Sequence, residues 1–298
     1  MQDVATLLAS PWRADLTEAD AAAVARALIG MGAAIVATHW LNTQVACDVV
    51  FTGVPRGEAA AILRQRFADA RFDIVVQRRQ GRRKDLLVAD MDATVIGQET
   101  LDEIAVIAGV AARIAPITER AMNGEIGFAE ALRARVALLQ GLHVGALEAA
   151  FDKVTLTPGA RTLVQTMRAH GAYTVLLSGG FTFFSSRVRS SAGFDLDIAN
   201  DLGIDDDHLD GTVAGPMMAP GAKRDALLRV AADQRIPLAE TLAVGDGAND
   251  IPMLEAAGLG VAFRPKPVVA AAIDVQLHHA DLTGLLYLQG YSAQEFRS

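Results

Sequence analysis

The chain has 298 residues and a formal net charge of −8, with 51% hydrophobic and 21% charged residues. This composition is typical of a soluble globular protein, and the negative charge argues against general nucleic-acid binding. No run approaches the roughly 18 uninterrupted apolar residues that a membrane span needs. Residues 1–14 also lack the basic region and apolar core of a signal peptide. We therefore expect a cytoplasmic protein with neither a membrane nor a nucleic acid as partner.

Residues 1–80 are predicted to form a small α+β domain. Four β-rich runs are expected to be strands, at residues 4–8, 33–41, 44–52 and 72–76. One helix is expected from the N-cap Thr17 to about Met31, and a second is expected to begin at Pro55. The order β-α-β-β-α-β predicts a ferredoxin-like unit.

In its position before the rest of the chain, this unit resembles the ACT-type regulatory domains found in front of some phosphatases. The resemblance implies an amino-acid sensor, and a structural or dimerising domain is an equal alternative; we expect a homodimer. The sole cysteine, Cys47, lies in an alternating apolar stretch and is interpreted as core packing. The basic cluster at residues 78–84 is interpreted as a solvated linker, with a polyanion-binding patch as the alternative.

From residue 85 to 298 the pattern changes to that of an α/β fold. Short apolar runs at 86–89, 173–177 and 241–244 end at polar, glycine-rich turns, with helical segments between them. This pattern predicts a doubly wound parallel sheet, in which ligands bind beyond the carboxyl ends of the strands. The helical stretch at about 98–160 is predicted to be a cap inserted after the first strand.

All three predicted strands end in residues that could take part in catalysis or ligand binding. Asp90 and Asp92 follow the first strand, and two carboxylates there are costly unless a cation or substrate meets them. One of them can act as a nucleophile and the other as an acid or base. Ser178-Gly179-Gly180 follows the second strand and offers donors to an anion. The run from Gly245 to Asp250 follows the third and is suited to a hard cation.

Together with Lys223, these motifs over residues 86–263 resemble the haloacid dehalogenase superfamily of phosphotransferases. The resemblance implies that Asp90 is a nucleophile that forms an aspartyl-phosphate and that Asp92 is the general acid and base. It implies Mg²⁺ as cofactor, held by the side chains of Asp90 and Asp246 and the main-chain carbonyl of Asp92, with Asp250 supporting the shell. The implied ligands of the phosphoryl oxygens are Thr94, Ser178, the Gly179 amide and Lys223.

Residues 90–105, 117–125 continuing through Phe128 and 132–136, and 280–287 further resemble the phosphoserine phosphatase family, which implies O-phospho-L-serine as substrate. Its ammonium would meet Glu99 and its carboxylate would meet Arg135. The resemblance also gives Met122 and Phe128 the apolar side of the pocket, and Asn249 a contact with substrate. Without it, Glu99 and Arg135 read as solvated helix charges. Two alternatives stay open: a phosphatase of another small ester, and an amino-acid-sensing regulator with an inactive phosphatase half.

Overall fold

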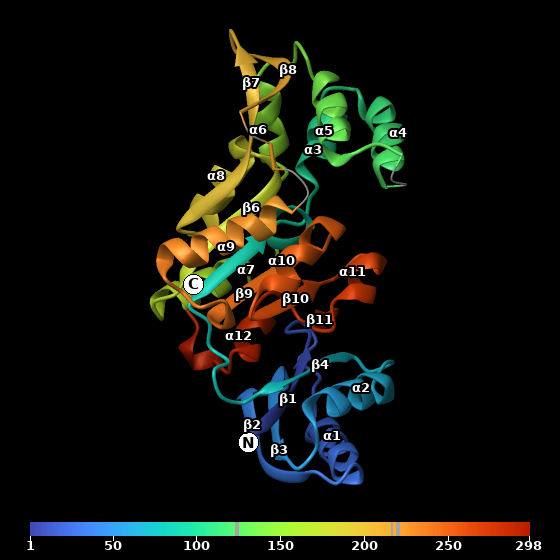
Figure 1. The fold of residues 1–298 in the computed structure, drawn as a ribbon, viewed down its shortest axis with the longest axis vertical. Helices are drawn as coiled ribbons and strands as arrows, with labels where there is room; N and C mark the ends of the chain where they lie inside the picture. The colour runs from blue at the N-terminus through green and yellow to red at the C-terminus, as the bar shows by residue number, and fades with distance from the viewer. Residues whose placement is uncertain (123–124, 216, 219–220) are drawn as a thin grey trace.

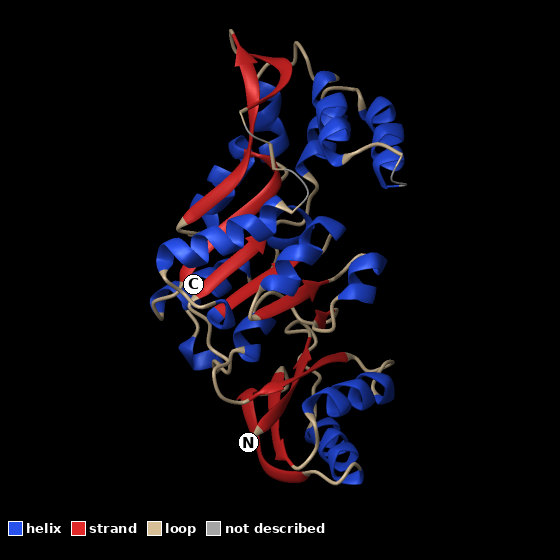
Figure 2. Cartoon of the chain, in the orientation of Figure 1, coloured by secondary structure: helices blue, strands red, loops and turns tan. Residues whose placement is uncertain are grey.

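The computed structural model describes residues 1–122, 125–215, 217–218 and 221–298, with the side chain of Met122 excepted. A four-stranded sheet lies at one end of the molecule, a seven-stranded sheet occupies the middle, and a group of helices lies at the other end (Figure 1). Figure 2 shows the two sheets as separate red layers, each with helices packed on it. Within the described ranges, no helix is long and apolar enough to cross a bilayer.

The amino-terminal region folds as an antiparallel sheet with two helices on one face. Its elements in chain order are β1 (Asp3–Ala9), α1 (Glu18–Gly30), β2 (Ala34–Asn42), β3 (Ala46–Thr52), α2 (Arg56–Arg66) and β4 (Phe72–Arg78). The strand order is β2-β3-β1-β4, with each pair antiparallel. Thr17 begins α1 through a capping box with Asp20. The predicted ferredoxin-like element order is confirmed, whereas the ACT-like character of the region stays a prediction.

Cys47 lies on β3 and is fully buried. Burial, assisted by the neighbouring charge of Asp48, raises the pKa of its thiol to about 12. The interpretation as core packing is confirmed.

We expect iodoacetamide at mildly alkaline pH to leave Cys47 unmodified in the native chain and to alkylate it after denaturation. Mass spectrometry measures both reactions, and rapid alkylation of the native chain would contradict the burial.

The central sheet is parallel except at one edge, in the order β11-β10-β9-β5-β6-β7-β8. Its strands are β5 (Leu86–Asp90), β6 (Tyr173–Phe181), β7 (Leu196–Asp205), β8 (His208–Ala214), β9 (Thr241–Gly245), β10 (Leu259–Phe263) and β11 (Gln276–Leu277). The antiparallel pair is β7 with β8. The doubly wound parallel sheet predicted for this part of the chain is confirmed.

Helices cover both faces of this sheet. One face packs against α7 (Ala160–Ala169), α8 (Thr182–Ala192) and α12 (Gly284–Leu288), and the other against α9 (Ala222–Gln234), α10 (Ile251–Ala256) and α11 (Pro267–Ala272). Because successive strand residues point to opposite faces, Leu87 joins the first core and Leu86 and Val88 join the second. Each leucine buried in this way stabilises the fold by about 1.5–3 kcal/mol. The two cores hold the carboxyl ends of the strands in fixed positions.

The inserted cap follows β5. It contains α3 (Thr100–Ile107), α4 (Ala111–Met122), α5 (Phe128–Ala137) and α6 (Gly145–Phe151). The connection before α6 pairs with the β7–β8 hairpin: Gly141 donates its N–H to the Leu209 carbonyl at 2.8 Å, and Val144 donates to the Asp207 carbonyl at 2.9 Å. The cap therefore rests on a β-hairpin that the prediction of a helical cap did not include, and its boundaries at about 98–160 stay a prediction.

Two of the five basic residues at the boundary, Arg82 and Lys84, are largely buried, whereas Arg78, Arg79 and Arg83 are exposed. The Arg82 side chain is 11% exposed and pairs with Asp48 at 2.8 Å. Lys84 is 8% exposed and donates to two backbone carbonyls. Nearby, Asp73 of β4 accepts backbone N–H groups of residues 278–280. The interpretation as a solvated linker is wrong for Arg82 and Lys84, because the amino-terminal sheet packs onto the rest of the chain there.

Candidate active site

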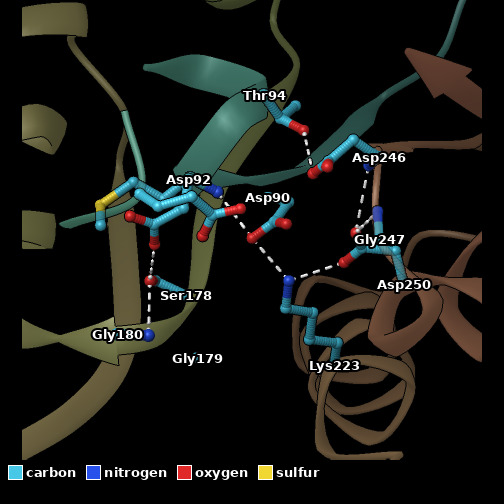
Figure 3. A network of polar contacts seen from close by, with 12 residues as sticks. Asp90, Asp92, Thr94, Ser178, Gly179, Gly180, Lys223, Asp246, Gly247 and Asp250 are labelled. Carbon is cyan, nitrogen blue, oxygen red and sulfur yellow. Dashed lines mark hydrogen bonds and ion pairs between the residues drawn. The ribbon is translucent and has the colours of Figure 1, made fainter. Parts of the chain in front are cut away.

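The predicted catalytic and metal-binding residues lie together at the carboxyl ends of three adjacent strands. Asp90 ends β5, Ser178 lies near the end of β6, and Asp246 directly follows β9. Because β9, β5 and β6 are neighbours and parallel, these ends share one edge of the sheet. Lys223 reaches the same place from the first turn of α9 (Figure 3).

The turn after β5 separates the two carboxylates of the first motif. Asp92 has an extended backbone (φ −66°, ψ 137°), and Ala93 is left-handed at φ 53°. This change of direction sends the Asp90 side chain toward Lys223 and the Asp92 side chain toward Ser178 (Figure 3). The two carboxylates therefore have different surroundings although they are two residues apart.

Asp90, Lys223 and Asp250 form a buried ionic cluster. The Nζ of Lys223 lies 2.5 Å from Oδ1 of Asp90 and 2.6 Å from Oδ1 of Asp250. None of the three residues is more than 5% exposed. Burial and then the charge of Asp250 raise the pKa of Asp90 well above its usual range, against the opposing effect of Lys223. Burial alone would lower the pKa of Lys223, but the two carboxylates raise it, so the ammonium is charged.

Asp250 also fixes the loop after β9. Its Oδ2 accepts the N–H groups of Asp246 at 3.2 Å and Gly247 at 2.9 Å. On the other side, Asp246 Oδ1 accepts the Thr94 hydroxyl at 3.2 Å. The position of the Asp246 carboxylate is therefore determined by both the first and the last motif (Figure 3).

The same acidic residues suit a metal ion. One carboxylate oxygen from each of Asp90, Asp246 and Asp250 lies within 4.8 Å of the others. Burial raises the pKa of Asp246, as it does that of Asp90, so both groups need a positive neighbour to stay ionised. Carboxylate oxygens are the ligands preferred by hard divalent cations. The donor set and its excess negative charge therefore fit a divalent ion at this position.

Asp92 is held at the second strand. Its Oδ1 accepts the Thr100 N–H at 2.7 Å, and its Oδ2 accepts the Ser178 hydroxyl at 3.0 Å. Ser178 in turn accepts the Gly180 N–H at 2.8 Å. Burial raises the pKa of Asp92, which favours a protonated carboxyl able to act as an acid. A Cβ at Gly180 would lie 3.3 Å from Asp92 Oδ2 and 3.1 Å from the Thr100 hydroxyl, so a side chain there would press on both.

Two residues of α5 (Phe128–Ala137) are predicted to contact substrate, and the structure places Phe128 beside the strand ends. The ring tip of Phe128, the first residue of α5, would lie 3.6 Å from a Cβ at Gly179. Arg135 lies two turns further along α5 and is near enough to Asp102 and Glu99 for their charges to act on it. Burial lowers the pKa of Arg135, and these two acids oppose the shift. The cap thus places the Phe128 ring beside the end of β6, and Arg135 within the electrostatic influence of Glu99 and Asp102.

Within the described part of the chain, the remaining predicted substrate residues make no hydrogen bond or ion pair with the strand-end acids Asp90 and Asp92. Glu99 is the N-cap residue of α3 and is about half exposed. Asn249 is exposed in the short 3-10 helix Ala248–Asp250 that follows β9. Met122 ends α4, and its side chain lies outside the described part of the chain.

Besides Thr100, which donates to Asp92, two further polar residues of the site were not predicted. Asn200 of β7 is fully buried and donates to the carbonyls of Gly179 at 2.8 Å and Gly180 at 3.2 Å. Lys266 lies just beyond β10 and pairs with both Glu99 and Asp246. The strand-end rule that located Asp246 would also have located Lys266, since β10 is the next strand in the sheet.

Comparison with known proteins identifies the family. Residues 87–255 match the haloacid dehalogenase-like hydrolase family. The chain belongs to this family. A solved HAD family hydrolase from Salmonella enterica serovar Typhi has a TM-score of 0.84 at 28% identity, covering 96% of this chain and 98% of its own.

Two curated relatives of this chain are named phosphoserine phosphatases. A phosphoserine phosphatase of Streptomyces coelicolor is 39% identical over 260 residues, which is 87% of this chain and 60% of that protein. A phosphoserine phosphatase of Idiomarina loihiensis is 42% identical over 201 residues, covering 67% of this chain and 91% of its own. This chain thus spans less than two thirds of the Streptomyces protein. The predicted superfamily is confirmed, and the roles of individual residues stay predictions.

Proposed function

We propose that this chain is a Mg²⁺-dependent phosphoserine phosphatase that hydrolyses O-phospho-L-serine to L-serine and phosphate, the last step of serine biosynthesis. The observation that carries the proposal is the buried cluster of Asp90, Lys223 and Asp250 beside Asp246 at the carboxyl edge of the sheet. The similarity to curated phosphoserine phosphatases supports the choice of substrate.

In the first step, Asp90 attacks phosphorus. The Met91 N–H at 2.8 Å and Lys223 at 2.5 Å both contact Oδ1, which fixes the carboxylate, and we assign the attack to Oδ2. A bond forms between Asp90 and phosphorus, and the bond from phosphorus to the serine oxygen breaks. The serine oxygen keeps the electron pair and takes a proton from Asp92, whose raised pKa favours the protonated form.

In the second step, water hydrolyses the aspartyl-phosphate. Asp92, now ionised, takes a proton from the water as its oxygen attacks phosphorus, and the bond to Asp90 breaks. We assign the phosphoryl oxygens to Thr94, Ser178, the Gly179 amide and Lys223, whose donors offset the developing charge. Ser178 would exchange its hydrogen bond to Asp92 for one to the phosphoryl group.

The proposed Mg²⁺ would be held by the side chains of Asp90 and Asp246 and the main-chain carbonyl of Asp92, with Asp250 supporting them. When bound, it supplies positive charge between the nucleophilic carboxylate and the phosphate, which reduces their repulsion. The chain's own contribution is to hold the acids together: Thr94 and Asp250 both fix the residues around Asp246.

Substrate recognition is assigned to four cap residues and to Asn249, which follows β9. Glu99 would bind the ammonium and Arg135 the carboxylate of phosphoserine, while Phe128 and Met122 exclude water and Asn249 touches the substrate. We expect Arg135→Ala to raise KM for phosphoserine about 10- to 100-fold, since hydrogen bonds between charged groups contribute about 1.5–3 kcal/mol. The KM for phosphoglycolate, which keeps the carboxylate, should rise by the same factor. The KM for phosphoethanolamine, which lacks the carboxylate, should stay unchanged. Equal losses on both esters would contradict the assignment.

A panel of phosphate esters tests the proposed substrate. We expect kcat/KM for O-phospho-L-serine to exceed that for sugar phosphates and nucleotides, with phosphothreonine as the nearest competitor. The phosphate released from each ester is measured at several concentrations. Equal kcat/KM values on sugar phosphates would reject this substrate in favour of another small ester.

The proposal extends to the organisation of the chain. We propose an ACT-like domain at residues 1–80, a phosphatase domain at 85–298 with its cap at about 98–160, and a cytoplasmic homodimer that binds neither membranes nor nucleic acids. The antiparallel amino-terminal sheet is the unit that would dimerise. Sedimentation velocity with and without added L-serine tests both the dimer and a sensing role, and a monomer under all conditions would reject the dimer.

A further inference from the structure

Lys266 lies on a rigid segment of backbone beside the site. It is the N-cap residue of α11 and stands between Pro265 and Pro267, which restrict the chain on both sides. Its N–H donates to the Asp246 carbonyl at 3.0 Å. The backbone of Lys266 is therefore tied directly to the loop that carries Asp246.

The ammonium group of Lys266 links two acids with different proposed tasks. Nζ lies 3.1 Å from Oε1 of Glu99 and 3.2 Å from Oδ2 of Asp246. Asp246 is 5% exposed, whereas the side chains of Lys266 and Glu99 are each about half exposed. Burial opposes the charge on Lys266, but Glu99 and Asp246 raise its pKa, so the ammonium stays charged. The charged ammonium of Lys266 thus links Asp246, which follows β9, with Glu99 at the start of α3.

We propose that Lys266 is a positioning residue that holds Glu99 close to Asp246 at the proposed substrate site and thereby sets the preference for phosphate esters that carry an ammonium group. This inference rests on the proposed function, which gives Glu99 the substrate ammonium. Glu99 begins α3 without a side-chain hydrogen bond to cap the helix, so its carboxylate has no cap contact to orient it. The ion pair at Oε1 orders the carboxylate before substrate arrives and leaves Oε2 for the incoming ammonium.

The expected size of the effect on KM follows from the exposure of the Lys266 and Glu99 side chains. An ion pair in which both side chains are half exposed contributes at most about 1 kcal/mol, which corresponds to about a 3- to 5-fold change in binding. The effect should appear in KM rather than in kcat, because Lys266 acts on a residue that binds substrate before chemistry. It should also depend on the charge of the ester.

The test compares Lys266→Met with the wild-type chain on three esters. Phosphoserine and phosphoethanolamine carry an ammonium, and phosphoglycolate does not. We expect KM to rise about 3- to 5-fold for the first two esters and to stay unchanged for phosphoglycolate, with kcat retained on all three. Lys266→Arg, which keeps the charge, should restore most of the affinity.

The chain offers a matched control in Lys153. This lysine is 49% exposed and pairs at 3.4 Å with Glu103, which also belongs to α3. Lys153→Met should leave KM unchanged for all three esters. In the Glu99→Gln background, Lys266→Met should add no further increase in KM, because the two substitutions remove the same interaction.

Three results would overturn the inference. An equal rise in KM on all three esters, accompanied by altered Mg²⁺ affinity in calorimetry, would place the action of Lys266 on the Asp246 loop. A fall in KM would show that Lys266 competes with the substrate ammonium. An unchanged KM would make the pair a surface contact without effect. Each of these leaves the proposed function intact, whereas a wild-type chain that fails to hydrolyse phosphoserine refutes the function itself.

Discussion

Replacing Asp90 by asparagine should abolish phosphate release from O-phospho-L-serine and leave the chain folded. An amide cannot attack phosphorus in place of a carboxylate, and loss of a covalent nucleophile lowers kcat by about 10⁴-fold or more. The fold should persist because burial and Asp250 already raise the pKa of Asp90, so the neutral amide relieves an unfavourable charge. Lys223 keeps its contact with Asp250 at 2.6 Å.

Two measurements check this outcome. Steady-state phosphate release gives the loss of kcat, and acid-quenched samples analysed by mass spectrometry reveal whether residue 90 becomes phosphorylated in the wild-type chain. The matched control is Asp225→Asn, which removes an exposed carboxylate on the same helix as Lys223 and should keep full activity. Substantial turnover by Asp90→Asn would contradict the covalent mechanism.

Replacing Lys223 by methionine should remove activity and also destabilise the metal-free chain. The substitution leaves Asp90 and Asp250 buried and close together without their shared counter-ion. Breaking a buried ion pair by removing one partner costs about 3–5 kcal/mol of the free energy of unfolding. Lys223 is thus expected to be both a ligand of the phosphoryl group and a structural part of the site.

Denaturant unfolding in EDTA measures this loss of stability. Arg224→Met changes the neighbouring residue, which is exposed and should alter the free energy of unfolding by less than about 0.5 kcal/mol. Adding Asp250→Asn to Lys223→Met should recover part of the lost stability, since it removes one of the two unpaired charges. A free energy of unfolding unchanged by Lys223→Met would show that the cluster is solvated.

Much of the fold and site is predictable because local signals and the strand-end rule agree. Short apolar runs followed by polar turns predict parallel strands, and adjacent parallel strands bring their carboxyl ends together. That rule alone places Asp90, Ser178 and Asp246 at one edge, as the structure has them. The assignment of Lys223 to the site came from the resemblance, since an isolated lysine on a helix is usually solvated.

The features that could not be predicted depend on contacts between distant segments. Arg82 is buried because it meets Asp48 across the amino-terminal sheet, 34 residues away. The pair of Lys266 with Glu99 joins positions 167 residues apart. From residue type alone, both basic residues would be predicted to lie on the surface. Their partners come from elements that are distant in the sequence and pack together only in the fold. The support of the cap by the β7–β8 hairpin has the same origin.

Phosphate release from O-phospho-L-serine by chain stripped of divalent ions, before and after Mg²⁺ is restored, tests the central claim most directly. The account predicts no release in EDTA, recovery with Mg²⁺, and a phosphate transiently attached to Asp90 during turnover. Full activity without a divalent cation, or phosphate attached to another residue, would contradict it.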